Sequence, residues 1–158
     1  MRKQIVDSAS REPGPIGRSD WLPLQEMAKV EVSSEDADHP IESAFSLGQT
    51  SGWQAGSLGK QSIRLVFDQP RTIRRIYLRF NEPAVARTQE FALRWSENRG
   101  DRLTEIVRQQ WNFSPEGSTA ESEDYQVDLK AVSILELTIN PDLGKGEAIA
   151  TLADWRLA

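Results

Sequence analysis

Alternation of apolar and polar residues constrains this chain of 158 residues more than any other feature. Two neighbouring runs between residues 61 and 80 place an apolar side chain at every second position, which is typical of strands that bury one face. The apolar positions of these runs are Ile63, Leu65 and Phe67, then Ile76, Leu78 and Phe80. The intervening DQPR sequence predicts a tight turn between two separate strands.

Similar alternation recurs along the rest of the chain and predicts about eight short strands with no long helix. The further candidate strands are residues 29–33, 88–96, 103–113, 125–129, 135–139 and 149–157. Residues 103–113 alternate less cleanly, which indicates a bulge or an edge position. Turn signals between the strands are spaced as in two packed sheets, so we predict an all-β fold, a β-sandwich of the jelly-roll type. A short helical turn is expected within residues 21–28.

The domain organisation follows from local composition. Residues 1–20 are polar and rich in proline and glycine, so they bury too little apolar area to offset their ordering entropy and are expected to form a flexible arm. Residues 21–158 suffice for a single sandwich domain. A long polar loop after the first strand ends at Trp53, and we interpret this ring as a plug beneath the loop rather than a platform for a ligand.

Composition excludes several classes of chemistry. The chain has no cysteine, which rules out disulfides and thiolate metal sites. Its 19 basic and 24 acidic residues give a formal net charge of −5, which disfavours nonspecific attraction to nucleic acid. Neither a signal-peptide core nor a run long enough to span a membrane is present, so we expect a cytoplasmic protein without membrane contact.

Catalytic and metal-binding patterns are missing as well. The sequence contains no nucleophile elbow, no phosphate-cradling glycine loop and no zinc-protease helix motif. His39 is the only histidine, and it stands beside Asp36 and Asp38 in a polar loop without the ligand count of a zinc site. We therefore expect a protein that is not an enzyme, that uses no cofactor, and in which His39 is a solvated loop residue.

Five arginines fall opposite the apolar rows and point outward from the strands. They are Arg64, Arg75, Arg79, Arg94 and Arg108. Acidic residues interleaved with them, Glu90, Asp128 and Glu136, indicate cross-strand ion pairing on a solvated face. The alternative is a surface for an anionic partner, in which Tyr77 would add a stacking ring.

The order and spacing of several short segments carry a resemblance to a known superfamily. They are SSE at 33–35, SGW at 51–53, FALRWS at 91–96, SILELTI at 133–139 and ATLADWRL at 150–157. With these segments, residues 29–158 resemble the galactose-binding-like jelly rolls, which include discoidin domains, coagulation-factor type C domains and many carbohydrate-binding modules. The resemblance implies ligand binding by loops at one end of the sandwich, sometimes beside a structural calcium.

The chain departs from the sugar-binding members at both of their usual sites. Ser46 and Leu47 occupy the positions where relatives commonly carry aspartate and glycine, which removes a carboxylate that calcium would need. Gln54 follows the loop tryptophan where a histidine is common, whereas Arg87 remains available in a later loop. A carbohydrate site would therefore use the residues Gln54, Asn81, Glu82 and Arg87, with Trp111 as the aromatic face.

Three hypotheses follow for the function. The first is a non-catalytic module that binds a carbohydrate or glycan by the loops at one end. The second is a protein-interaction module with an exposed patch around Phe113 and the loop 114–123. The third is a module that binds DNA breaks, because residues 33–67 resemble the opening of the N-terminal domain of the eukaryotic scaffold protein of single-strand-break repair. The net charge of −5 argues against this third hypothesis.

Overall fold

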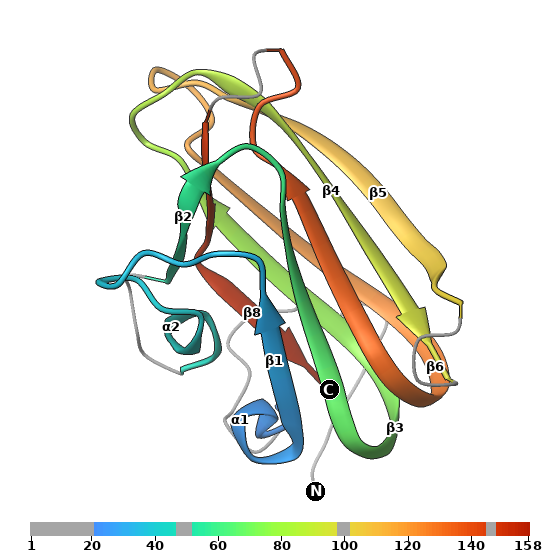
Figure 1. Ribbon diagram of the computed structural model, residues 1–158. Helices are drawn as coiled ribbons and strands as arrows, with labels where there is room; N and C mark the ends of the chain where they lie inside the picture. The colour runs from blue at the N-terminus through green and yellow to red at the C-terminus, as the bar shows by residue number, and fades with distance from the viewer. Residues whose placement is uncertain (1–20, 47–51, 98–101, 145–147) are drawn as a thin grey trace, which may run out of the picture.

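The computed structural model describes residues 21–46, 52–97, 102–144 and 148–158 (Figure 1). Short helical turns occur only near the start of this part of the chain, and antiparallel strands make up most of the remainder. In chain order the elements are α1 (Leu24–Met27), β1 (Ala28–Val32), α2 (Glu42–Phe45), β2 (Trp53–Leu58), β3 (Gln61–Asn81), β4 (Arg87–Ser96), β5 (Thr104–Phe113), β6 (Ala120–Asn140), β7 (Ile149–Leu152) and β8 (Asp154–Leu157). The predicted helical turn near the N-terminus and the predicted count of about eight strands are confirmed.

Two long strands organise the sandwich. β3 and β6 each have 21 residues and pair with one another along their whole length. Both bend back sharply at the lower end of the molecule in Figure 1, where the register shifts between Val66 and Arg71. Ala131 in β6 adopts a positive φ of 56° at the same bend. Each strand thereby contributes one half to each of two facing layers.

The two layers contain different partners of the long strands. Around the first half of β3 and the second half of β6, the strand order is β1-β3-β6-β4-β5. The other halves pair with each other, and β8 joins β3 between residues 76 and 79. A small separate sheet pairs β2 with β7. This arrangement is the predicted β-sandwich of the jelly-roll type.

The core lies between the layers and is built from the predicted alternating rows. The three predicted inward residues of each half of β3 are at most 1% exposed, as are Phe91 and Leu93 of β4. β6 adds a row with the same burial, namely Leu135, Leu137 and Ile139. Because burial of an aliphatic or aromatic side chain contributes about 1.5–3 kcal/mol, these rows fix which face of each strand points inward.

Trp53 fills the space beneath the long loop, as predicted. It is 1% exposed, and its indole Nε1 donates a hydrogen bond of 3.1 Å to the carbonyl oxygen of Ser34. Ile41, Ala44 and Phe45, on and beside α2, are also buried and close this side of the core. Trp53 is therefore a structural residue and offers no face to a ligand.

Several predicted boundaries are wrong. Residues 61–67 and 73–80 form one strand, as do 125–129 and 135–139, so DQPR lies within the bend of β3 and not between separate strands. The predicted last strand, 149–157, is two strands, because the amide of Ala153 donates to the carbonyl oxygen of Arg79 and the chain changes partner there. The loop predicted at 114–123 ends earlier, since β6 begins at Ala120.

Other predictions about the chain have mixed outcomes. β5 lies at the edge of the sheet and pairs with β4 through a register shift after Leu93, which confirms both explanations of its irregular pattern. The predicted flexible arm at 1–20 lies outside the described residues, as do Leu47 and the centre of the predicted turn at 96–101. No helix in the described segments has the length and hydropathy required to cross a bilayer.

Candidate ligand-binding site

The bends in β3 and β6 bring their four ends to the same end of the sandwich, opposite the bend itself (Figure 1). The segment after Asn81 leads from β3 to β4, and the segment after Asn140 leads from β6 towards β7. The small β2–β7 sheet stands beside them, because the hydroxyl of Thr151 donates to the carbonyl oxygen of Asn81 at 3.2 Å. Loops far apart in the sequence therefore meet at one end.

A pocket of about 540 Å³ opens between these loops. Its lining combines amides, carboxylates and a hydroxyl with small aliphatic side chains. The lining residues are Gln54, Asn81, Glu82, Pro83, Val85, Ala86, Asp142, Ala148, Ile149 and Thr151. The structure thus brings together three of the five residues predicted for a carbohydrate site, and it does so from β2, the end of β3 and the loop that follows.

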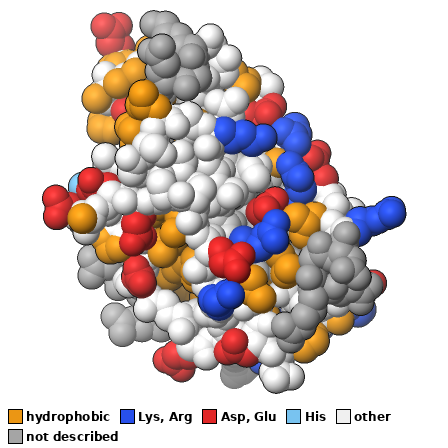
Figure 2. All heavy atoms as spheres, viewed as in Figure 1, with side chains coloured by type: hydrophobic (Ala, Val, Ile, Leu, Met, Phe, Trp, Pro, Cys, Tyr) orange, Lys and Arg blue, Asp and Glu red, His pale blue; other side chains and the backbone are white. Residues whose placement is uncertain are grey.

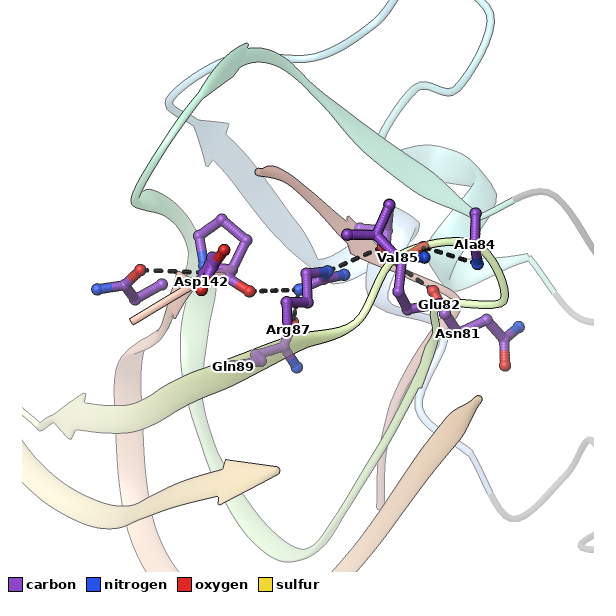
Figure 3. A network of polar contacts seen from close by, with 10 residues as sticks. Asn81, Glu82, Ala84, Val85, Arg87, Gln89 and Asp142 are labelled. Atoms are coloured by element: carbon purple, nitrogen blue, oxygen red, sulfur yellow. Dashed lines mark hydrogen bonds and ion pairs between the residues drawn. The ribbon is translucent and has the colours of Figure 1, made fainter. Parts of the chain in front are cut away.

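Arg87, the fourth predicted residue, lies behind the pocket and does not line it. Its side chain has no exposed surface, and its Nε donates to Glu82 at 2.8 Å. Its Nη1 donates to the carbonyl oxygen of Pro141 at 2.6 Å and to the side chain of Gln89 at 3.2 Å. Figure 3 shows Arg87 between the segments that carry Glu82 and Asp142. Its position suits a residue that holds two pocket loops together.

Glu82 shapes the loop that forms one wall of the pocket. One carboxylate oxygen accepts from Arg87, while the other accepts from the backbone amides of Ala84 and Val85, each at 3.2 Å (Figure 3). A side-chain acceptor that satisfies consecutive backbone amides is a common way to stabilise a turn. The charge of Glu82 is therefore compensated by Arg87, and its acceptor positions are occupied by its own loop.

Trp111, the fifth predicted residue, is not part of this pocket. It lies on edge strand β5 opposite Gln89, half-buried against the core. Its indole Nε1 is buried and has no hydrogen-bond partner among the described residues, so the polar edge of the ring faces the protein. Phe113, proposed for an exposed patch, is only 2% exposed because the Arg87 guanidinium covers its ring at 5.0 Å. The expectation of an exposed Phe113 is wrong.

Sequence reasoning missed the second half of the pocket, formed by Asp142, Ala148, Ile149 and Thr151. These residues lie far along the chain from Asn81. The pairing of β7 with β2 brings Ile149 and Thr151 to the site, and the bond from Arg87 to the carbonyl oxygen of Pro141 holds the residue before Asp142 there. The pairs Gln54–Thr151 and Leu58–Ile149 define that register. A turn signal, NPDLG at 140–144, was visible in the sequence, but nothing in it indicated a shared pocket.

Several buried polar side chains lie between Arg87 and the interior of the sandwich. Gln89 has no exposed surface, and Glu121 on β6 is 1% exposed. Burial, together with the nearby carboxylate of Glu123, raises the pKa of Glu121 to about 8, against the opposing influence of Gln89. Burial beside the same two carboxylates also raises the pKa of Tyr125. Burial therefore favours the neutral form of the Glu121 carboxyl.

The outward arginines are paired with acidic side chains. Arg64, Arg75, Arg79 and Arg108 contact Glu136, Asp124, Asp154 and Glu90 at 2.6–3.3 Å. Figure 2 shows basic and acidic side chains interleaved over one face of the molecule. The predicted cross-strand pairing is confirmed for these four arginines, and Glu90 and Glu136 are among the predicted partners. Asp128 is not, because it pairs with Lys130 on its own strand. The charges of these four arginines are therefore balanced by acidic neighbours.

His39 makes a local contact in its loop. Its Nδ1 lies 2.8 Å from the carboxylate of Asp36, and this hydrogen bond is the main reason why the pKa of Asp36 is lowered. The two residues also form an isolated β-bridge. The described segments contain no group of three or more side chains suited to hold a metal ion.

A second pocket of about 430 Å³ lies beside α1 and α2. It includes Trp21, Phe45 and the guanidinium of Arg156. That guanidinium already donates to the carbonyl oxygen of Ser46 at 2.9 Å and to Asp154 at 2.8 Å. These bonds leave the pocket at the loop end as the better candidate, because no described residue bonds to the side-chain amides of Gln54 and Asn81 there.

The described strands form a β-sandwich of the jelly-roll type, with this pocket at its loop end. Among solved structures, the chain is similar to the family 32 carbohydrate-binding module of NanJ from Clostridium perfringens, solved in complex with galactose. That match has a TM-score of 0.58 at 16% identity and covers 85% of this chain and 95% of the other. No protein-family model matches the chain, and no curated protein matches its sequence.

Two further structures have the same fold and different ligands. The family 32 module of AlyQ, solved in complex with 4,5-unsaturated mannuronic acid, matches with a TM-score of 0.58 at 15% identity and covers 84% and 95% of the two chains. A chitosan-binding module from a Paenibacillus sp. IK-5 chitosanase/glucanase matches with a TM-score of 0.55 at 17% identity and covers 83% and 94%. At these identities the likeness concerns the fold.

Proposed function

We propose that this domain is a non-catalytic binding module that recognises a carbohydrate in the pocket at the loop end. The observation that carries the proposal is the pocket itself, because about 540 Å³ of mixed polar and aliphatic lining is of the size and character of a small-ligand site. The similar modules of known structure were solved with saccharides or are named for one. Their fold presents loops at one end, as this chain does.

The polar groups of the pocket suit sugar hydroxyls. Within the described segments, the side-chain amides of Gln54 and Asn81 have no hydrogen-bond partner, although both residues line the pocket. An amide offers both donors and an acceptor, so each can serve two hydroxyls of one ring. Pro83, Val85 and Ile149 supply an aliphatic wall for the C–H face of the sugar.

A glycan array followed by calorimetric titration of the best ligand tests the proposal. We expect at least one saccharide to bind the wild-type domain and Gln54→Ala with Asn81→Ala to abolish that binding. The matched control is Gln126→Ala, which removes an exposed amide on β6 towards the bend. A domain that binds no saccharide, or a pocket variant that binds as well as the control, contradicts the proposal.

A second candidate is a protein-interaction module, favoured by exposed apolar residues around the same pocket. Leu58, Val85 and Leu143 are 61%, 51% and 41% exposed. Val85 lines the pocket, Leu58 pairs with the lining residue Ile149, and Leu143 follows the lining residue Asp142. Figure 2 shows apolar side chains gathered at this upper end of the molecule. Exposed apolar side chains gathered in one place are a feature of surfaces that bind other proteins.

The two candidates give different results with one pair of variants. Leu58→Ser with Leu143→Ser removes exposed apolar side chains around the pocket that are not among its described lining residues, and leaves the amides of Gln54 and Asn81 in place. If a saccharide is the ligand, this variant retains most of the binding that the amide variant loses. If a protein is the ligand, this variant loses its partner in a pull-down while the amide variant retains it.

A further inference from the structure

A row of polar side chains leads from the wall of the pocket into the interior of the sandwich. Glu82 lines the pocket and accepts from Nε of Arg87 at 2.8 Å. Nη1 of Arg87 in turn donates to the side-chain oxygen of Gln89 at 3.2 Å. Arg87 and Gln89 occupy successive inward positions of β4. The row ends on this strand at Gln89, because the next inward residue, Phe91, is apolar.

Glu121 of β6 continues the row from the facing layer. It pairs with Phe80 in the register of β3 and β6, and the Phe80 ring packs on Phe91 of β4 with the ring centroids 5.2 Å apart. Phe91 is two positions from Gln89 on the same face of β4, which brings the Glu121 carboxyl close to the Gln89 amide. The influence of Gln89 on the pKa of Glu121 agrees with this placement. Both residues are at most 1% exposed, so the two groups meet away from bulk solvent.

The groups at this junction have hydrogen-bonding capacity that the described residues do not use. Nη2 of Arg87, Nε2 of Gln89 and both carboxyl oxygens of Glu121 are buried there without a hydrogen-bond partner. A buried polar atom without a partner is costly, and a charged acceptor binds a donor about twice as strongly as a neutral one. Ionisation of Glu121 should therefore draw the Gln89 amide, and the guanidinium behind it, towards the carboxylate.

In the described part of the chain, the titratable groups around Glu121 are Glu123 and Tyr125 on β6 and Arg87 on β4. Glu123 and Tyr125 follow Glu121 at every second position, so they lie on the same face of the strand. Burial is the main reason why the pKa of Glu121 is raised, and the Glu123 carboxyl adds to this effect. Burial also raises the pKa of Tyr125, so this hydroxyl stays neutral where Glu121 titrates.

We infer that the proton on Glu121 controls the wall of the pocket through Gln89 and Arg87. With Glu121 neutral, the guanidinium is committed to Glu82 and to the carbonyl oxygen of Pro141, and the two pocket loops are held together. With Glu121 ionised, the Gln89 amide donates to the carboxylate, the guanidinium follows, and the bond to Glu82 weakens. A ligand that requires the closed loops then binds more tightly at lower pH and, by reciprocity, raises the proton affinity of Glu121. This coupling belongs to the pocket and holds for a sugar or a protein ligand.

NMR of the ligand-free domain tests the inference. Carbon-detected spectra follow the carboxyl carbons of Glu121 and Glu82 and the guanidinium carbon of Arg87, across a pH range that spans the ordinary pKa of 4.5 and the raised value of about 8. We expect the Glu82 and Arg87 signals to shift with the same midpoint as the Glu121 carboxyl. Glu121→Gln should remove these shifts, because glutamine keeps the shape of the side chain and has no proton that titrates. Glu116→Gln, in the exposed loop before β6, is the matched control and should retain them.

Gln89→Met tests the route between the two ends of the row. Methionine has a similar volume and no amide, so Glu121 should still titrate while the Glu82 and Arg87 signals no longer shift at its midpoint. Shifts that persist in a folded Gln89→Met variant overturn the route through Gln89.

The comparison of the wild type with Glu121→Gln decides even if Gln89→Met does not fold. Glu82 and Arg87 signals that stay constant while Glu121 titrates, or that shift equally in Glu121→Gln, overturn the inference, as does an ordinary pKa for Glu121. Because no ligand is present in these measurements, such a result leaves carbohydrate binding standing. A glycan array without a binder equally leaves the coupling standing.

Discussion

The guanidinium of Arg87 donates to the carboxylate of Glu82 at 2.8 Å from a side chain with no exposed surface. The same guanidinium donates to the carbonyl oxygen of Pro141, 54 residues further along the chain. One buried cation therefore fixes both loops that carry charged groups into the pocket. Binding sites on loops need such support, because a ligand gains little affinity from groups that it must first order.

Replacing Arg87 should destabilise the whole domain. Arg87→Met leaves Glu82 without its cation and the Pro141 carbonyl without a donor, and breaking a buried ion pair costs about 3–5 kcal/mol. Urea unfolding followed by circular dichroism measures the change in free energy of unfolding. Arg108→Met is the matched control, since that side chain is 42% exposed and its ion pairs contribute about 1 kcal/mol or less. Equal effects of the two substitutions would show that burial of Arg87 has no energetic consequence.

The buried carboxyl of Glu121 predicts a pH dependence of stability. Its pKa rises from the ordinary value of 4.5 to about 8 on folding, mainly because of burial. Between these values the folded chain holds a proton that the unfolded chain has lost, so stability falls as the pH rises. The contribution is fully present below the unfolded pKa and is lost as the pH passes through the folded pKa. Because one pKa unit corresponds to about 1.4 kcal/mol, the loss is on the order of a few kcal/mol.

The comparison of Glu121→Gln with the wild type isolates this effect. Gln carries no proton that titrates. The variant should therefore lose the decline in free energy of unfolding between pH 4.5 and about 8, and it should be more stable than the wild type at the upper pH. Glu116→Gln, in the exposed loop before β6, should retain the full decline. Urea unfolding at a series of pH values measures all three proteins. A wild-type decline that Glu121→Gln leaves intact would assign the titration to another group.

Two glycines should respond differently to alanine. Gly52 has a φ of +65°, and a Cβ there would lie 2.5 Å from the carbonyl oxygen of Leu152, so Gly52→Ala should destabilise by more than about 1 kcal/mol. At Gly117 the nearest atom, in Ser114, would be 3.8 Å away, and Gly117→Ala should be neutral or slightly stabilising. Thermal unfolding measures both. A tolerated Gly52→Ala would mean that β7 can move away from Trp53.

The strands were predictable because burial of one face requires apolar and polar residues to alternate in the sequence. Ile63, Leu65 and Phe67 show the period of two plainly, and each is at most 1% exposed. The continuity of β3 around the bend could not be predicted from such alternation. Residues 68–72 are exposed, and their polar, proline-containing sequence is equally compatible with a turn. Local patterns therefore reported which residues lie inside, but not which strands are continuous.

Prediction of the candidate site was limited by the same difference between local and long-range information. Gln54 comes directly after the loop tryptophan, and Asn81 and Glu82 stand at the end of a strongly alternating strand, so the resemblance could place them at one end of the sandwich. Asp142 reaches the pocket because the end of β6 pairs with β3 and β4 and because Arg87 donates to the carbonyl oxygen of Pro141, and such contacts between distant segments depend on the whole fold. Arg87 was predicted to be near the ligand, yet its burial could not be inferred from a loop of mixed polarity.

The bend in β6 provides the last prediction, because Ala131 has a φ of 56° there. A left-handed conformation costs an alanine about 1–2 kcal/mol, a cost that glycine largely avoids. Ala131→Gly should therefore stabilise the domain by about 0.5–1 kcal/mol, after the entropy of glycine in the unfolded chain is subtracted. The matched control is Ala120→Gly, also exposed in β6 and without a positive φ, which should destabilise by a similar amount. Chemical denaturation distinguishes the two, and a loss of stability in both variants would show that the bend is not strained at Ala131.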